Sequence, residues 1–136
     1  MWGHPRKFTR LFARWADAGY VVAAPAFPHT NDETPPPYLF EDVVNQPGDV
    51  SFVLGELLAR GLGDGERVGV GGYSLGAETA LAVGLHPRYA DPRVRAVVAV
   101  AGALFHPDFA GDVLGPSRCC SSTARRTRRR IGSGRR

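Results

Sequence analysis

The pattern of hydrophobic residues along the chain predicts helices that alternate with strands. Between Pro5 and Ala18 the hydrophobic residues follow the 3.6-residue repeat of an amphipathic helix, at Phe8, Leu11, Phe12, Trp15 and Ala16. Gly19 then stands where a glycine that ends a helix is expected. The next five residues, Tyr20–Ala24, form a continuous apolar run, which predicts a strand buried on both faces.

The same alternation repeats further along the chain. After a loop over residues 25–37 with three consecutive prolines, Pro47 marks the first turn of a helix that ends at Gly61. The apolar positions of this helix again have helical spacing, at Val50, Val53, Leu54, Leu57 and Leu58. We expect later elements in the order strand, helix, strand, over Arg67–Val70, Ala77–Leu85 and Val94–Val100. This order predicts an α/β fold with three parallel strands and flanking helices.

Charge divides the chain into two parts, an acidic domain over residues 1–115 and a basic tail over residues 116–136. Of 17 basic and 13 acidic residues, eight arginines and no acid lie within residues 117–136. The rest therefore carries nine basic and 13 acidic residues, a formal charge of −4, although the whole chain has +4. An acidic domain gives no reason to expect a specific nucleic-acid surface. The tail lacks apolar periodicity, which predicts disorder.

Two interpretations of the tail stay open. It is either a polybasic arm that binds polyanions, such as nucleic acid or an anionic membrane, or a translation in a shifted reading frame. For one choice of GC-rich codons, reading Ser117–Arg128 one base earlier gives Val-Pro-Leu-Leu-Leu-Val-His-Gly-x-Ala-Asp-Glu. That alternative sequence is an apolar strand followed by His-Gly-x-x-Asp.

The strand-to-helix junction carries Gly72-Tyr73-Ser74-Leu75-Gly76, the G-x-S-x-G pattern of a nucleophile elbow. A serine at the apex of such a turn has a strained backbone, and small neighbours two residues away on each side let strand and helix approach. The serine also lies at a helix N-terminus, where free amides stabilise negative charge. The pattern thus predicts Ser74 as a nucleophile and the Leu75 amide as an oxyanion-hole donor. A plain glycine turn is the alternative.

With this motif, the chain resembles the α/β-hydrolases, on the branch of dienelactone hydrolases, chlorophyllases and platelet-activating-factor acetylhydrolases. The resemblance covers about residues 3–115 and rests on four stretches, at residues 18–25, 44–53, 72–76 and 91–98. It implies a serine hydrolase that forms an acyl-enzyme with small-molecule carboxylic esters and needs no metal or cofactor. It also implies that Met1 stands at the position of the second oxyanion donor.

The resemblance further implies a catalytic acid and histidine after the nucleophile, in the order Ser, Asp or Glu, His. Asp108 is a candidate acid, because it follows the third strand, but no histidine stands where the family has its base. The family also has a strand between those over Tyr20–Ala24 and Arg67–Val70, and none is found here. We therefore expect an incomplete domain with impaired activity and marginal stability.

Other features of the sequence suggest no further chemistry. The two cysteines are adjacent, at Cys119 and Cys120, and no Cys/His cluster has metal-ligand spacing. His4 and His29 are expected in loops rather than in catalysis. No run is long enough to span a membrane, and no signal peptide is recognised, so a cytoplasmic location is the default. A non-enzymatic product whose tail binds polyanions is the alternative function.

Overall fold

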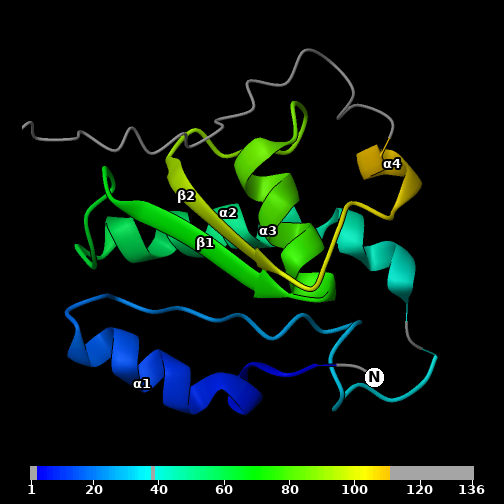
Figure 1. Ribbon diagram of the computed structural model, residues 1–136, viewed down its shortest axis with the longest axis horizontal. Coiled ribbons are helices and arrows are strands. Elements are labelled where there is room, and N and C mark those ends of the chain that lie inside the picture. The colour runs from blue at the N-terminus through cyan, green and yellow to red at the C-terminus, as the bar shows by residue number, and fades with distance from the viewer. Residues whose placement is uncertain (1–2, 38, 111–136) are drawn as a thin grey trace, which may run out of the picture.

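The computed structural model describes residues 3–37 and 39–110, which form a mixed α/β structure (Figure 1). Its two strands are β1 (Val68–Tyr73) and β2 (Val94–Val100). Its helices are the 3-10 helices η1 (Pro5–Phe8) and η2 (Phe40–Val44) and the α-helices α1 (Thr9–Asp17), α2 (Gln46–Ala59), α3 (Leu75–Leu85) and α4 (Pro107–Ala110). The helical repeats of the sequence thus predict α1 and α2 correctly, and the helix expected over Ala77–Leu85 is found as α3. Gly19 and Gly61 follow α1 and α2 with φ of 89° and 72°, as glycines that end helices do.

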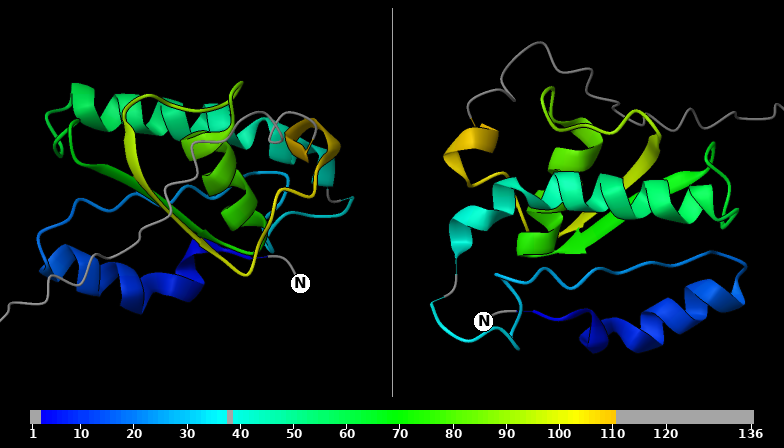
Figure 2. Two further views of the ribbon diagram at one scale, coloured as in Figure 1. Left: turned by 45° about the horizontal axis from the view of Figure 1, so that its top comes forward. Right: turned by 180° about the vertical axis from the view of Figure 1, so that it is seen from behind.

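The two strands pair in parallel, with α3 as the crossover between them. Their register aligns Val70 with Val97 and Tyr73 with Val100. Helix α3 packs against both strands, and α2 packs against α3 on the side away from the sheet (Figure 2). The approach of α3 to β2 is close, because a Cβ atom at Gly84 would lie 2.1 Å from Cγ2 of Val97.

The segment over residues 20–24 differs from its prediction. It is extended and runs beside β1 in the same direction (Figure 1), but it belongs to no strand. The backbone of residues 21–26 makes no hydrogen bond with any described residue. The expectation of burial on both faces is also wrong, since Tyr20 is 63% and Val21 54% exposed. The reason is that helix α1 covers only one side of the segment and the sheet does not extend to it.

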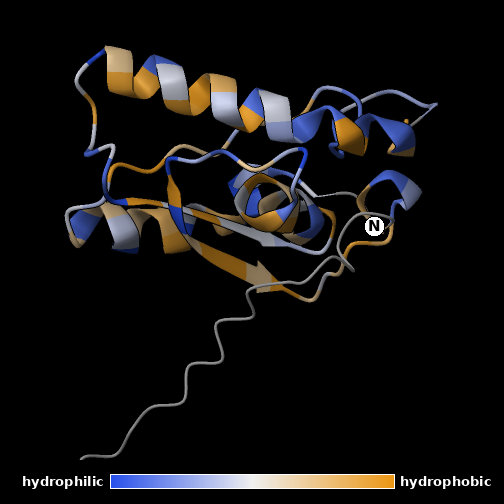
Figure 3. Cartoon of the chain, turned by 90° about the horizontal axis from the view of Figure 1, so that it is seen from above, coloured by the Kyte–Doolittle hydropathy of each residue, from blue (hydrophilic) through white to orange (hydrophobic). Residues whose placement is uncertain are grey.

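The hydrophobic core is small and lies beside α3 rather than within the sheet. Val43, Ala82 and Phe109 are fully buried, with Leu75 and Tyr89 packed against them. His86 joins this core, because it is fully buried with its ring 4.9 Å from that of Tyr89 and 5.8 Å from that of Phe109. Hydrophobic residues also dominate β2 (Figure 3). Two of them, Val98 and Val100, are at least half exposed.

A buried polar group ties the loop after residue 25 to the helices. Gln46, at the start of α2, is 1% exposed. Its amide nitrogen donates to Oγ1 of Thr30 at 2.8 Å, and its amide oxygen accepts from Oγ1 of Thr79 at 2.5 Å. Both polar atoms of the buried Gln46 side chain therefore have a hydrogen-bond partner, as buried polar groups usually do.

Candidate active site around Ser74

Ser74 lies at the sharp turn between β1, which ends at Tyr73, and α3, which begins at Leu75. Its backbone has φ 54° and ψ −119°, a region that residues other than glycine rarely adopt. The Ser74 amide donates to the carbonyl of Val100 at the end of β2, at 2.9 Å. The surrounding structure therefore holds the strained residue in place from both strands.

Two glycines make room for this turn. A Cβ atom at Gly72 would lie 1.8 Å from the carbonyl oxygen of Gly76, so only glycine fits there. A Cβ atom at Gly102 would lie 2.5 Å from the carbonyl oxygen of Ser74 and 2.6 Å from Cβ of Ala77. At Gly76, by contrast, a Cβ atom would meet nothing within 4 Å. The expected steric requirement thus holds for Gly72 and is wrong for Gly76, while no sequence pattern indicated Gly102.

The first turn of α3 presents amide groups beside Ser74. The Ser74 carbonyl accepts from the amides of Ala77 and Glu78 at 2.9 and 3.3 Å, whereas no described residue accepts a hydrogen bond from the Leu75 amide. Amides in the first turn of a helix lack partners within it, and the helix dipole adds positive potential there. The arrangement can therefore stabilise an anion that forms next to Ser74.

A pocket of about 130 Å³ opens beside Ser74. Leu75 and Glu78 of α3, Phe40 of η2, and Ala101 and Phe105 from the segment after β2 complete its lining. Ser74 itself is exposed, and its hydroxyl makes no hydrogen bond with a described residue. No pattern in the sequence indicated Phe40, Glu78 or Phe105 as pocket residues. The only signal for Glu78 was that it is the one charged residue in α3.

The candidate acid and the histidines do not join this pocket. Asp108 lies next to His106, with Oδ2 3.8 Å from Nδ1, and its side chain is 58% exposed. His4 caps η1, accepting from the Arg6 amide at 3.1 Å, as expected of a loop residue. His86 is part of the core. Among the described residues, therefore, no acid–histidine pair contacts the Ser74 hydroxyl.

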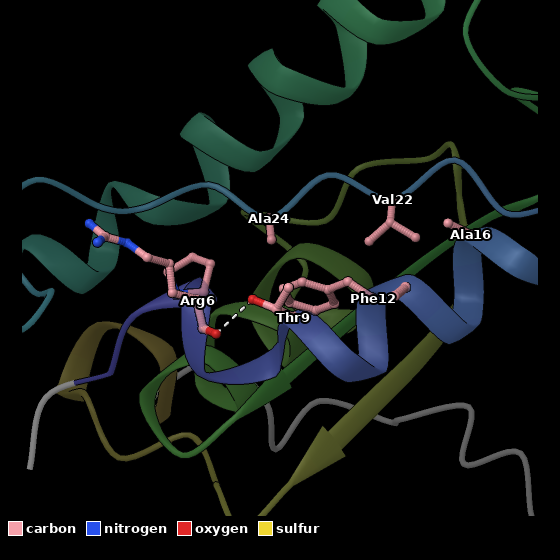
Figure 4. A pocket seen from close by; sticks show the side chains of 8 residues that line it. Arg6, Thr9, Phe12, Ala16, Val22 and Ala24 are labelled. Carbon is pink, nitrogen blue, oxygen red and sulfur yellow. Dashed lines mark hydrogen bonds between the residues drawn. The ribbon is translucent and has the colours of Figure 1, made fainter.

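A larger pocket, of about 500 Å³, lies between α1 and the extended segment. Figure 4 shows Val22 and Ala24 pointing from this segment toward α1, where Phe12 and Ala16 line the same space. Thr9, also in the lining, donates through its hydroxyl to the carbonyl of Arg6 at 2.7 Å. The lining holds no acid, histidine or cysteine, so this pocket offers a hydrophobic surface without a nucleophile or base.

The carboxyl groups whose pKa values are clearly shifted, those of Asp91 and Asp32, do not line the Ser74 pocket. Hydrogen bonds from Arg93 hold the pKa of Asp91 well below its usual range. The ammonium of Lys7, 2.5 Å from Asp32, lowers the pKa of that exposed carboxyl group in the same way. Within the described residues, no group of three or more His, Cys, Asp or Glu side chains could hold a metal ion. None of the described helices combines the length and hydropathy needed to cross a membrane.

Several predictions of the sequence fall outside the described residues. These are the second oxyanion donor at Met1, the boundary between the domain and the tail at residue 115, and the arginine-rich tail over residues 116–136. Comparisons with protein-family models, with curated proteins and with solved structures find no match to this chain.

Proposed function

We propose that this chain is a serine hydrolase of the α/β-hydrolase type, whose Ser74 forms an acyl-enzyme with carboxylic esters. The observation that carries the proposal is the backbone of Ser74, with φ 54° and ψ −119° between a parallel strand and a helix. Strain in a non-glycine residue persists only where the surrounding structure enforces it, and such sites concentrate at functional residues. Here Gly72 and Gly102 leave the space that the strained turn needs.

In the proposed reaction, Oγ of Ser74 attacks the ester carbonyl carbon and loses its proton to a base. The carbonyl oxygen becomes an oxyanion, which the Leu75 amide stabilises by a hydrogen bond. Collapse of this tetrahedral intermediate breaks the bond to the leaving oxygen, which takes up a proton and departs as the alcohol. Water then attacks the acyl-enzyme in the same manner and releases the carboxylic acid and free Ser74. The reaction requires no metal or cofactor.

Among the described residues, the site has no histidine that could act as the general base for Ser74. No described histidine reaches the Ser74 hydroxyl, and Asp108, the candidate acid, has its nearest described partner in His106. We therefore propose that the chain acylates slowly. Removing a triad member from a serine hydrolase leaves a residual acceleration of about 10³–10⁴ over water, from the oxyanion hole and binding alone.

The finer fold assignment is part of the same proposal. The extended segment over residues 20–24 runs beside β1 in the same direction, yet the two make no hydrogen bonds to each other (Figure 1). These features support a place for a further parallel strand between them, as in the α/β-hydrolases that the sequence resembles. With that strand, residues 20–24 would pair as the parallel strand that the apolar run predicts.

The proposal is tested by covalent labelling. The protein is treated with a fluorophosphonate probe, with and without added imidazole, and the modified serine is identified by mass spectrometry. We expect slow labelling at Ser74, faster in imidazole because the small base replaces the missing side chain. The variant Ser74→Ala should lose this label.

The matched control is Ser51→Ala, because Ser51 lies in α2 and has the same hydroxyl without the strained turn. This variant should label like the original protein. If Ser74 reacts no faster than Ser51 under either condition, Ser74 is not an activated nucleophile and the proposal fails. Labelling at the rate of a complete esterase would instead contradict the expected impairment.

A further inference from the structure

Glu78 is a buried carboxylate that is held by backbone groups. The residue is 1% exposed, and its Oε1 accepts hydrogen bonds from the amides of Phe105 and His106, both at 2.6 Å. No described cation forms an ion pair with it. A buried carboxylate is tolerated when strong hydrogen bonds replace its hydration. The two amides therefore account for the presence of Glu78 in a helix that has no other charged residue.

The same side chain lies at the Ser74 pocket. Glu78 stands one helical turn after Ser74, to whose carbonyl its amide donates at 3.3 Å. Its side chain lines the pocket together with Ser74, and Phe105 lines the pocket too. The carboxylate thus connects the helix that carries Ser74 to the segment that forms another wall of the pocket.

At Phe105, the segment that forms this wall is held mainly by these hydrogen bonds. The segment leaves β2 through Ala101, whose φ is 52°, and Gly102, which lies against the Ser74 carbonyl. Phe105 is 72% exposed, so packing does not hold its ring in place. Further along the chain, Phe109 of α4 is fully buried. Between Gly102 and Phe109, the hydrogen bonds to Glu78 join Phe105 and His106 to α3, and Leu104 packs against the core cluster that includes Ala82 of α3.

We infer that Glu78 is a positioning residue of the Ser74 site, because it fixes Phe105 at the pocket and so sets which acyl groups the pocket accepts. Its Oε1 accepts hydrogen bonds from the amides of Phe105 and His106, and Glu78 itself does not contact the reacting atoms. The predicted effect of Glu78 on acylation rests on the proposed function of Ser74. The predicted protection of the Phe105 and His106 amides is independent of that function.

Two variants distinguish the effect of the length of the Glu78 side chain from the effect of its charge. Glu78→Gln keeps an oxygen at the same distance along the side chain and removes the charge. Glu78→Asp keeps the charge and shortens the side chain by one methylene. Thr79→Val is the matched control, because Thr79 is also buried in α3 but bonds to Gln46 instead of the segment after β2.

The first measurement is amide hydrogen exchange by nuclear magnetic resonance. In Glu78→Asp we expect exchange at Phe105 and His106 to rise by about tenfold or more relative to the amides of β1, since lost hydrogen bonds permit local opening. In Glu78→Gln and in Thr79→Val these two amides should keep their protection relative to β1.

The second measurement is the acylation rate of Ser74 with p-nitrophenyl acetate and p-nitrophenyl hexanoate. In Glu78→Asp the ratio of the two rates should change by about tenfold, because displacing a positioning group by an ångström has effects of this order or larger. Glu78→Gln should restore the original ratio, which a mere loss of stability would not do.

The inference is overturned if Glu78→Asp keeps both amides protected, or if Glu78→Gln exposes them while Glu78→Asp does not. It is also overturned if Glu78→Gln keeps the amides protected but selectively slows reaction with a cationic ester, because the carboxylate then acts as a counter-ion. If no variant acylates at Ser74, the proposed function fails, while the exchange rates still decide whether Glu78 holds the segment.

Discussion

Ser74 shows how much the site depends on single glycines. Its strained turn brings the backbone of residue 72 against the carbonyl of residue 76, and it brings Gly102 against the Ser74 carbonyl. The motif contains two glycines, but only one of them is required sterically. The distinction cannot be read from a pattern of residue types, because it depends on which Cβ position faces the neighbouring backbone.

A pair of alanine substitutions tests this distinction. Gly72→Ala should destabilise the protein by about 3 kcal/mol, because the new methyl group overlaps the Gly76 carbonyl. Gly76→Ala should be neutral or stabilise by about 1 kcal/mol, because its Cβ atom meets nothing and alanine favours helices. Urea unfolding followed by circular dichroism measures both. Equal losses in the two variants would contradict the described turn.

At the scale of elements, the sequence predicted the helices well and the sheet less well. Helix α2 and strand β2 follow from local signals, namely helical spacing after Pro47 and an apolar run at residues 94–100. Residues 20–24 carry an equally strong apolar run and form no strand. A strand needs a paired neighbour, and pairing between distant segments is not encoded in the composition of either one.

The sequence likewise predicts only part of the candidate site. The strand, the turn and the helix around Ser74 follow from the motif. The pocket walls do not, because Phe40 and Phe105 lie on segments that meet Ser74 only through tertiary packing. Glu78 could have been noticed as a lone charge in an apolar helix, but its partners are backbone amides 27 and 28 residues away, which no sequence pattern marks.

An ion pair near the start of β2 links elements and depends on pH. Asp91 accepts from the Arg93 guanidinium at 2.9 and 2.6 Å, and Arg93 also donates to the carbonyl of Ser51 in α2 at 2.9 Å. The pKa of Asp91 is lowered in the folded protein. The pair therefore stabilises the fold above the ordinary aspartate pKa of about 4, and this contribution is lost as the pH falls below it.

We expect Asp91→Asn to lower the free energy of unfolding at pH 7 by about 2 kcal/mol, the order of a hydrogen bond to a charged group. The difference from the original protein should shrink as the pH falls below about 4, because the original protein then loses the same interaction. Urea unfolding at a series of pH values measures this. The control Glu56→Gln removes an exposed pair with Arg60 and should cost less than about 0.5 kcal/mol. A loss for Asp91→Asn that is independent of pH would contradict the role of the charge.

The molecule as a whole has a small core and a large exposed hydrophobic surface. Among residues 3–37 and 39–110, the buried hydrophobic side chains of the core, apart from Phe109, are valines and alanines. Tyr20, Phe52, Leu85 and Phe105 are each more than 60% exposed. Helix α3 packs against the sheet, whereas Val98 and Val100 of β2 are at least half exposed. Such surfaces favour association and leave little margin of stability.

We therefore expect the isolated chain to be marginally stable and to self-associate. Sedimentation velocity should show species larger than a monomer that increase with concentration. Urea unfolding should give a broad transition, with a slope below the range of about 1–3 kcal/mol per molar that small cooperative domains show. A monomer that unfolds in one sharp transition would contradict this expectation.

The hydrogen bonds of Gln46 restrict which substitutions the sequence can accept during evolution. Thr30, Gln46 and Thr79 lie on three separate segments, yet their side chains share one buried set of donors and acceptors. Loss of any one of them would leave a polar atom of another without a partner, at a cost of about 1–3 kcal/mol. Among homologous chains, these three positions should therefore covary, either keeping the polar set or replacing it together with hydrophobic residues.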